Sequence, residues 1–235
     1  MSALDEARQD LVAANRILAR EGVLDAYGHV SVRHPDHPDR YILSRARSPE
    51  LVEDADLVDF ALDGTPLQEM SGPPYIERFI HGAAYEARPD VMAVCHNHLI
   101  SILPFSISTD TRLRPVIHSG RALGEAEIRV WDIAQESGPD TDLLVRTMDQ
   151  GRSLSRILGG GVVTLMRGHG SVVACASIAQ VVQTCVSVDR NARVQMDAMR
   201  LGGIVPLHPG EVARAGQRLA NDNRAWEYWK RRAGF

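Results

Sequence analysis

The sequence predicts an α/β fold in which a central, largely antiparallel or mixed sheet is flanked by helices. Several short segments of strand type come as hairpins or adjacent pairs, which is typical of antiparallel strands. Longer segments with apolar residues at helical spacing lie before, between and after them. Helices and a sheet in this arrangement bury their apolar faces against one another in layers. We therefore expect residues 1–235 to form a single layered domain of this kind.

The composition is that of an ordinary globular protein and excludes several classes of function. The chain is 44% hydrophobic and 24% charged, and its net charge of -4 argues against nucleic acid as the main partner. No apolar run approaches the roughly 20 residues that a membrane-spanning helix needs. The charged N-terminus is unlike a secretory signal. Three cysteines lie in apolar segments without metal-binding spacing, so we expect reduced core thiols and a cytoplasmic location.

A helix opens the chain and strands follow it. Residues 2–21 place apolar side chains on one helical face, and Gly22 follows as a stop signal. Three segments after it have the composition of strands: residues 26–33, 41–44 and 56–60. A turn rich in proline and aspartate joins the first two, which predicts a hairpin. Residues 48–50 predict a short helix with Ser48 as its cap and proline at its first position.

The middle of the chain predicts one clear helix and then shorter elements. Residues 75–88 have an apolar face at helical spacing, and Pro89 ends the pattern. Residues 102–107 predict a loop around Pro104. Short strands are expected at residues 91–96, 116–118 and 128–133.

The last third of the chain predicts long helices around a buried hairpin. A helix is expected over residues 139–158, weakened at Gly151. Two buried strands follow at residues 162–166 and 172–176. Residues 177–180 predict a capping box that opens the longest helix, which ends near Met199. A final helical region after Pro209 carries three aromatic residues that favour a core or subunit contact: Trp226, Tyr228 and Trp229.

Histidines and a glutamate suggest a metal site. His96 and His98 end a predicted strand two residues apart, so their side chains point to the same side with Cβ atoms about 6–7 Å apart. Two imidazoles at that spacing can converge on one divalent metal. Glu77 on the preceding helix can supply a carboxylate oxygen or carry a proton. His169 lies between two glycines in a tight turn, whose backbone freedom lets the imidazole project.

Alternatives remain open for several of these residues. An H-x-H pair alone is also typical of surface or hydrogen-bonded core histidines. His118 ends a short apolar run and is either a site residue or a structural histidine. Together, three histidines, a carboxylate and an open position are the ligand set of a catalytic metal. These ligand types suit zinc, manganese, iron or cobalt, and the sequence does not choose among them.

Two arginines form a candidate anion site. Arg45 and Arg47 stand beside the predicted helix start at residues 48–50, where guanidinium groups and backbone N–H groups can bind carboxylate or phosphate. The alternative is a pair of solvated loop arginines. The chain contains no Walker loop, dinucleotide-binding G-x-G-x-x-G or nucleophile-elbow G-x-S-x-G, which leaves a metal as the best source of chemistry.

Three motifs in this order carry a family resemblance: Gly-His-Val-Ser-Val-Arg at 28–33, Glu77 with His-Asn-His at 96–98, and Arg-Gly-His-Gly at 167–170 before a long helix. With them the chain resembles the class II aldolase and adducin superfamily over nearly its whole length. The resemblance implies that His96, His98 and His169 hold a divalent metal and that Glu77 ligates it or acts as the acid/base. It also implies a homotetramer with sites near subunit interfaces.

The chain departs from the sugar-phosphate aldolases of that superfamily where they bind phosphate. His29 replaces an asparagine, Tyr75 and Ile76 replace paired serines, and Ser-Arg-Ala-Arg at 44–47 replaces a Thr-Gly pair. The chain is therefore more similar to the branch that decarboxylates hydroxylated aromatic acids, such as dihydroxyphthalates and hydroxypyridine dicarboxylates. This resemblance implies five substrate-binding residues: His29, Ser31, Ser44, Arg45 and Arg47.

We therefore expect a divalent-metal-dependent, non-oxidative decarboxylase of a hydroxylated aromatic mono- or dicarboxylic acid. The metal would stabilise an enolate or phenolate, and Glu77 or His118 would transfer the proton. Arg45 or Arg47 would hold a second carboxylate. The alternative is a metal-dependent retro-aldolase acting on a non-phosphorylated hydroxy-keto acid with the same ligands. A non-catalytic, adducin-like interaction module predicts degraded ligands and is disfavoured, because all four ligands are present.

Overall fold

The computed structural model describes residues 2–214 and 223–235, and its centre is a seven-stranded sheet in the order β3-β2-β1-β4-β7-β6-β5. The strands are β1 (His29–Arg33), β2 (Arg40–Ser44), β3 (Leu57–Ala61), β4 (Ala93–Asn97), β5 (Val130–Trp131), β6 (Val163–Met166) and β7 (Gly170–Cys175). Neighbouring strands are antiparallel except β5 and β6, which are parallel. The predicted mixed, largely antiparallel sheet flanked by helices is therefore confirmed.

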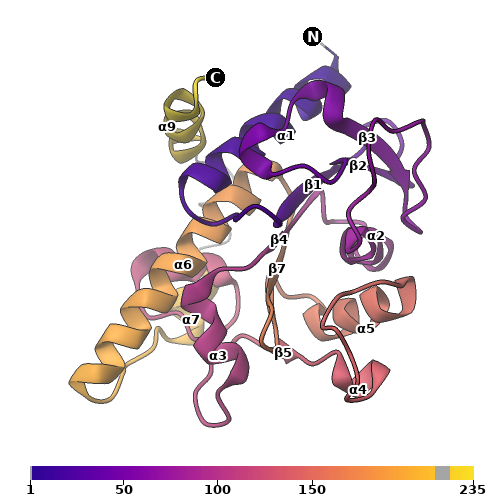
Figure 1. The fold of residues 1–235 in the computed structure, drawn as a ribbon. Helices are drawn as coiled ribbons and strands as arrows, with labels where there is room; N and C mark the ends of the chain where they lie inside the picture. Colours follow the sequence, from indigo (N-terminus) through magenta and orange to yellow (C-terminus); the bar gives the residue numbers. More distant parts are fainter. Residues whose placement is uncertain (1, 215–222) are drawn as a thin grey trace.

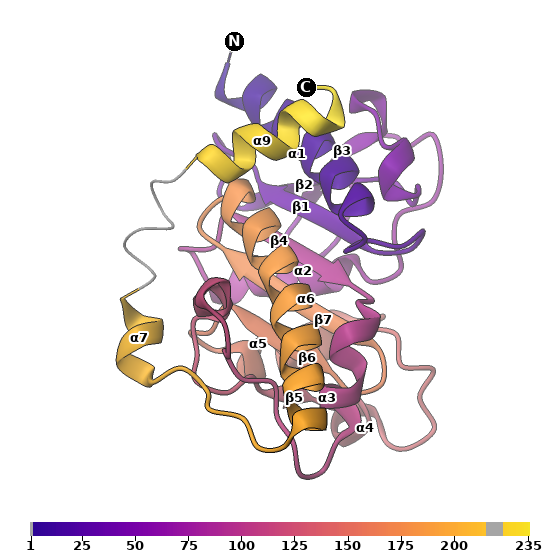
Figure 2. The same ribbon diagram turned by 90° about the vertical axis from the view of Figure 1, so that its left-hand side faces the viewer.

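Helices cover both faces of this sheet (Figures 1 and 2). On one face lie α1 (Ala3–Arg20), α6 (Ile178–Leu201) and α9 (Arg224–Ala233), and on the other lie α2 (Arg78–Ala87) and α5 (Met148–Leu158). Shorter helices complete the chain: α3 (Leu103–Ile107), α4 (Ala134–Ser137), α7 (Pro209–Ala213) and the 3-10 turns η1 (Pro49–Leu51), η2 (Asp54–Asp56), η3 (Ile100–Ile102) and η4 (His118–Leu123). None of the described helices is both long and apolar enough to cross a membrane.

Alternation along the strands divides the interior into two cores. On β1, Val30 and Val32 pack toward α1 and α6, whereas His29, Ser31 and Arg33 face α2. All five residues are nevertheless buried, because helices lie on both sides of the sheet. The core on the α1 side contains all three cysteines: Cys95, Cys175 and Cys185.

Capping accounts for where the long helices begin. The Ser2 hydroxyl accepts the Asp5 N–H, and the Asp5 side chain accepts the Ser2 N–H, which is a complete capping box on α1. On α6 the Ser177 hydroxyl accepts the Gln180 N–H at 3.2 Å, and of the expected capping box only this half is formed. Both predicted helices are confirmed within a few residues at each end.

Several shorter elements differ from the sequence-based expectation. Residues 102–107 were expected to form a loop but are largely helical, because Pro104 sits in the first turn of α3, where its missing N–H has no helical partner. The strand expected at 116–118 is absent: the Val116 N–H donates to the side chain of Asn191 on α6, and η4 begins at His118. The strand expected at 128–133 shortens to Val130–Trp131.

The helix expected over residues 139–158 begins only at Met148. Thr147 and Gln150 form its capping box, and the helix runs through Gly151 without a break. Before it, the side chains of Thr141 and Asp142 accept the N–H groups of Leu143 and Leu144, which holds the chain in a turn instead of a helix. At residues 48–51 a 3-10 turn forms with proline at its start, but the Ser48 side chain makes no capping bond.

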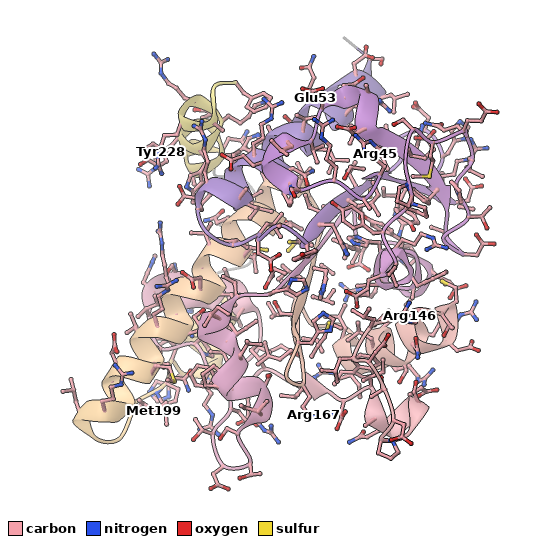
Figure 3. All side chains as sticks on the ribbon, in the orientation of Figure 1. Arg45, Glu53, Arg146, Arg167, Met199 and Tyr228 are labelled. Carbon is pink, nitrogen blue, oxygen red and sulfur yellow. The ribbon has the colours of Figure 1, made fainter. Side chains whose placement is uncertain are left out.

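The three C-terminal aromatic residues lie in different environments. Trp226 and Trp229 on α9 are buried in the core on the α1 side. Tyr228 lies on the outer side of α9 with 57% of its surface exposed (Figure 3). Part of the helical region predicted after Pro209 falls at residues 215–222, outside the described residues. The predicted core contact is therefore found for the two tryptophans and not for Tyr228.

Candidate metal centre

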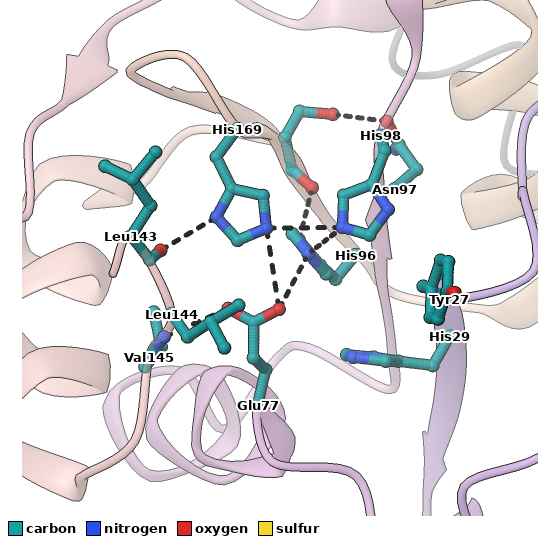
Figure 4. Close-up of polar contacts among 12 residues, drawn as sticks. Tyr27, His29, Glu77, His96, Asn97, His98, Leu143, Leu144, Val145 and His169 are labelled. Atoms are coloured by element: carbon teal, nitrogen blue, oxygen red, sulfur yellow. Dashed lines mark hydrogen bonds and ion pairs between the residues drawn. The ribbon is translucent and has the colours of Figure 1, made fainter. Parts of the chain in front are cut away.

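The four predicted ligands meet at one end of the sheet. His96 is on β4 and His98 follows it, His169 lies in the turn between β6 and β7, and Glu77 precedes α2. One nitrogen or oxygen of each lies within 4.8 Å of the corresponding atoms of the others (Figure 4). The convergence expected from the H-x-H spacing is thus found in the fold.

The distances among the four groups suit a shared cation. The Nε2 atoms of His96 and His98 are 2.9 Å apart, and those of His98 and His169 are 3.2 Å apart. The Oε2 atom of Glu77 is 3.4 Å from the Nε2 atom of His96 and 3.5 Å from that of His169. Two donors bound to one metal at about 2.1 Å can be at most about 4.2 Å apart, and all four distances fall below that limit.

Outer hydrogen bonds determine which nitrogen of each imidazole faces the centre. The Nδ1 atoms donate to groups that can only accept: the Ser171 carbonyl for His96, the Asp25 carboxylate for His98 and the Leu143 carbonyl for His169. In a neutral imidazole the Nε2 lone pair then remains, so three lone pairs point at one another. Without a cation between them they would repel, and this donor set therefore fits a divalent metal.

Burial favours the protonation states that a metal requires. Burial lowers the pKa of His169 to about 4 and also lowers the pKa of His98, so these rings are neutral near pH 7. Burial by itself would raise the pKa of Glu77. The facing His96 and His169 and the N–H of Val145 outweigh it and lower the Glu77 pKa to about 2. Glu77 is therefore a carboxylate, able to bind a cation or accept a proton.

One short loop holds two of the four groups. Leu143 has a left-handed backbone, with φ of 68°, and its carbonyl accepts from His169 at 2.9 Å. Two residues later the Val145 N–H donates to Oε1 of Glu77 at 3.0 Å. A non-glycine residue in this conformation carries backbone strain, which is common where a loop positions functional groups.

Of the two glycines beside His169, Gly168 has the conformational role that the sequence predicted, and Gly170 has a different one. Gly168 has a φ of 65°, in the left-handed region that a tight turn requires. At Gly170 a Cβ atom would lie 2.0 Å from the carbonyl oxygen of Asn97. Only glycine lets β7 approach β4 this closely, and this approach brings His169 beside His98.

A cavity of about 590 Å³ opens onto this centre. That size suits a small-molecule ligand. Besides His98, His169 and Glu77, three further polar residues line it: His29, Arg47 and Ser48. The rest of the lining is apolar or aromatic: Ala26, Tyr27, Ala46, Pro73, Pro74, Tyr75, Ile76 and Leu144.

The predicted substrate-binding residues do not all reach this cavity. His29 and Arg47 line it, whereas Ser31, Ser44 and Arg45 do not. Ser31 is fully buried beneath His29 and bonds to His81 and Tyr85. Ser44 is also fully buried, at the end of β2.

The two arginines share one buried aspartate. Asp56 is 3% exposed and accepts from Arg45 Nε at 2.8 Å and from Arg47 Nη1 at 2.8 Å. Burial would raise the Asp56 pKa, but the Glu53 N–H and the two guanidinium groups outweigh it and lower the pKa. Figure 3 shows Arg45 and Glu53 on the same side of the molecule. Neither arginine is the freely solvated loop residue of the alternative interpretation, and about one positive charge remains on the three groups.

His118 lies away from the cavity. It begins η4, which packs against α6, its ring is exposed, and its Nε2 atom is 2.6 Å from Nη2 of Arg121. Within one chain His118 is not among the described residues that line the cavity. Of the two predicted proton carriers, Glu77 alone is in place in this chain.

Sequence reasoning missed three sets of residues around the site. Asp25 orients His98 from 73 positions away, and the loop at 143–145 holds Glu77 from 68 positions away and His169 from 26 positions away. No local pattern signals such contacts. His81 could have been found, because it follows Glu77 by four residues and thus lies one helical turn away on the same face.

Comparisons with known proteins identify the family and agree with the fold. The sequence profile of the Class II Aldolase and Adducin N-terminal domain family matches residues 9–196. "Decarboxylase tropJ" of Talaromyces stipitatus is 35% identical over 94% of this chain and 91% of its own length. A "3,4-dihydroxyphthalate decarboxylase" of Arthrobacter keyseri is 27% identical over 84% of this chain and 80% of its own length. An aldolase II superfamily protein from Pseudomonas syringae has a similar fold, with a TM-score of 0.80, 22% identity and coverage of 99% and 94% of the two chains.

Proposed function

Because this chain belongs to the class II aldolase and adducin family, we propose that it is a divalent-metal-dependent lyase that decarboxylates a hydroxylated aromatic acid. The observation that carries this proposal is the convergence of three imidazole lone pairs and a carboxylate at the mouth of a largely apolar cavity. Relatives named as decarboxylases, one of them a dihydroxyphthalate decarboxylase, support this reaction over aldol cleavage.

The residues that would hold the metal are Glu77, His96, His98 and His169. When bound, a divalent cation supplies Lewis-acid stabilisation of the negative charge that forms on a substrate oxygen as CO2 leaves. Zinc, manganese, iron and cobalt all suit this donor set. Asp25 and the loop at 143–145 keep the imidazoles and the carboxylate aimed at one point.

The cavity walls would orient a planar ring. Tyr75, Ile76 and Leu144 offer apolar and aromatic surface beside the metal centre. Arg47 reaches the cavity and would bind a carboxylate or another anionic oxygen, although Asp56 already takes part of its charge. Arg45 would act behind it, through the shared Asp56, instead of touching the substrate.

Glu77 would return a proton to the ring carbon that loses CO2. It lines the cavity, and its carboxylate can take a proton from the substrate hydroxyl and give it back at carbon. His118 could contribute only if a neighbouring subunit carried it to this cavity, which the family's tetramer would allow. That tetramer stays a prediction, for which the exposed apolar residues Ile100, Ile107 and Leu201 offer support. Sedimentation of the purified protein tests it, and a monomer would remove the role of His118.

The direct test is CO2 release from metal-loaded protein. The substrate panel contains dihydroxyphthalates, hydroxypyridine dicarboxylates and, as aldol substrates, non-phosphorylated hydroxy-keto acids. We expect CO2 from an aromatic acid and loss of the activity after a chelator, with recovery when the metal is restored. Aldehyde or pyruvate without CO2 would establish the retro-aldolase instead, and activity that survives the chelator would refute the metal dependence.

A further inference from the structure

A chain of buried hydrogen bonds leads from the cavity into the interior. His29 Nδ1 is 2.6 Å from His81 Nε2, and His81 Nδ1 is 2.6 Å from the Ser31 hydroxyl oxygen. That oxygen is 2.8 Å from the Tyr85 hydroxyl. The chain therefore joins two residues of β1 to two residues of α2. Only its outer end, His29, lines the cavity.

Both histidines in this chain are neutral. Burial lowers the pKa of His81 to about 3. His29 is only 2% exposed, and among the described residues its ring hydrogen-bonds to His81 and to no carboxylate, so nothing there stabilises a charged ring. A neutral imidazole carries one N–H, so each ring has one donor and one acceptor nitrogen. Each hydroxyl likewise has one proton to donate, and when every proton in this series has an acceptor the hydrogen bonds run in a single direction from one end to the other.

Tyr85 decides that direction. Its hydroxyl is buried, and among residues 2–214 and 223–235 the Ser31 oxygen is the one acceptor within reach. A buried O–H without an acceptor is costly, enough to disfavour the reverse direction by roughly 5- to 150-fold. Tyr85 therefore donates to Ser31, and Ser31 donates to Nδ1 of His81.

The same logic extends to the cavity. With Nδ1 accepting from Ser31, the proton of His81 lies on Nε2 and is donated to Nδ1 of His29. The proton of His29 must then be on Nε2, which has no partner among the described residues. The ring lies 4.4 Å from that of Tyr75, centroid to centroid, and Figure 4 shows it extending from β1 toward Glu77.

We propose that Tyr85, Ser31 and His81 hold His29 as the Nε2–H tautomer, so that His29 donates a hydrogen bond to an anionic oxygen of the substrate beside the metal centre. The nature of that substrate rests on the function proposed above. His29 touches the substrate, whereas His81, Ser31 and Tyr85 are positioning residues. A buried neutral donor aimed at an oxygen that gains charge stabilises the transition state without reorganisation.

This series of hydrogen bonds does not supply protons to the reaction. Net transfer outward through His29 would leave a phenolate at Tyr85, and burial raises the Tyr85 pKa strongly. Tyr85 therefore cannot supply a proton, and the role of this series of hydrogen bonds is to determine the direction in which His29 donates.

The test is a measurement of the His29 tautomer in zinc-loaded protein that carries ¹⁵N-labelled histidine. Long-range ¹H–¹⁵N correlations distinguish protonated from unprotonated ring nitrogens, and the loss of signals in His29→Gln assigns them. We expect a protonated Nε2 and a bare Nδ1 in the wild type. In Tyr85→Phe the directing donor is gone, and we expect a mixture that includes the Nδ1–H tautomer.

Tyr41→Phe is the matched control. Tyr41 is equally buried, its ring centroid is 5.5 Å from that of Tyr85, and its hydroxyl donates to the Arg78 carbonyl instead of to the chain. We expect this variant to keep the wild-type tautomer. A bare Nε2 or a doubly protonated His29 in the wild type would overturn the proposal, and so would equal spectra from the two phenylalanine variants.

A second readout uses salicylate as an anionic probe of the cavity. Its Kd should rise roughly tenfold in Tyr85→Phe and stay unchanged in Tyr41→Phe, with equal zinc content in both. The tautomer is measured without substrate, so it stands or fails independently of the reaction. A confirmed tautomer with no CO2 release would refute the proposed function alone, and an unchanged salicylate affinity in Tyr85→Phe would refute the role of the chain in binding.

Discussion

Both faces of the sheet are buried, but one packs mainly apolar side chains and the other also carries the residues of the metal centre. The face toward α1, α6 and α9 is filled mainly by aliphatic side chains and three thiols. The face toward α2 and α5 holds aromatic and aliphatic residues together with Glu77, His81 and the histidines of the strands. Along β4 successive side chains point to alternate faces, with Cys95 on the first face and His96 on the second.

The difference shows how one strand can serve both stability and chemistry. Apolar burial on the first face stabilises the sheet without constraining what lies on the other. On the second face every polar group needs a partner, and the partners come from distant segments, such as Asp25 for His98. We therefore expect substitutions on the first face to change stability and substitutions on the second to change the site.

The largest expected effect is the loss of a proposed ligand. His96→Ala or His169→Ala should weaken metal binding by more than about 100-fold. Mutating a residue that only hydrogen-bonds to a metal ligand already lowers metal affinity by about 10- to 100-fold. Metal analysis after dialysis measures this, together with CO2 release. Cys95→Ala, one residue away on the opposite face, is the control and should retain the metal. Full metal occupancy in either histidine variant would contradict the ligand assignment.

A core truncation on the first face should produce the opposite pattern. Leu18 on α1 is fully buried in the aliphatic core, and Leu18→Ala should lower the free energy of unfolding by about 2–5 kcal/mol. The metal content of the folded protein should not change. Denaturant unfolding and metal analysis test the two statements together, and Leu67→Ala at a partly exposed position should cost less than about 0.5 kcal/mol. Loss of metal from folded Leu18→Ala would remove the distinction between the two faces.

A smaller, pH-dependent effect is expected at the rim of the cavity. Asp56 has a folded-state pKa below its unfolded value, so its contribution is present above about pH 4 and is lost as the pH falls through the folded-state pKa. Asp56→Asn should cost about 1 kcal/mol at pH 7, since both arginines are partly solvated.

Unfolding curves at several pH values test this prediction. The difference between wild type and Asp56→Asn should shrink toward zero at low pH, whereas Asp36→Asn, at an exposed turn, should match the wild type throughout. A difference that is constant with pH would show that the aspartate acts by packing instead of by charge.

Much of the site could be read from short motifs because their geometry is local. The spacing of His96 and His98 along a strand and the turn at Gly168 need no distant partner to be interpreted. Elements that depend on distant partners were misplaced. The strand expected at 116–118 is absent because a side chain of α6, 75 positions away, takes the Val116 N–H.

The predicted substrate-binding residues also divide into those that line the cavity and those that do not. His29 and Arg47 were predicted and line the cavity, whereas Ser31 and Ser44 are buried and do not line it. Strand alternation does not reveal whether a polar face meets solvent, a helix or a ligand. On β1 the polar side chains are covered by α2, which the strand composition of residues 26–33 did not show. Arg45 was placed correctly beside Arg47, but Asp56, which binds both, was not foreseen.

The sequence by itself determined the mixed α/β architecture, the family and the four residues that could hold a metal, since these depend on local periodicity and on motif order. Only the tertiary structure decided which ring nitrogens face the centre, which arginine reaches the cavity and which residues stand behind His29. The physical reason is that a hydrogen bond needs two groups within about 3 Å, and the fold alone brings together partners that are 26 to 75 positions apart.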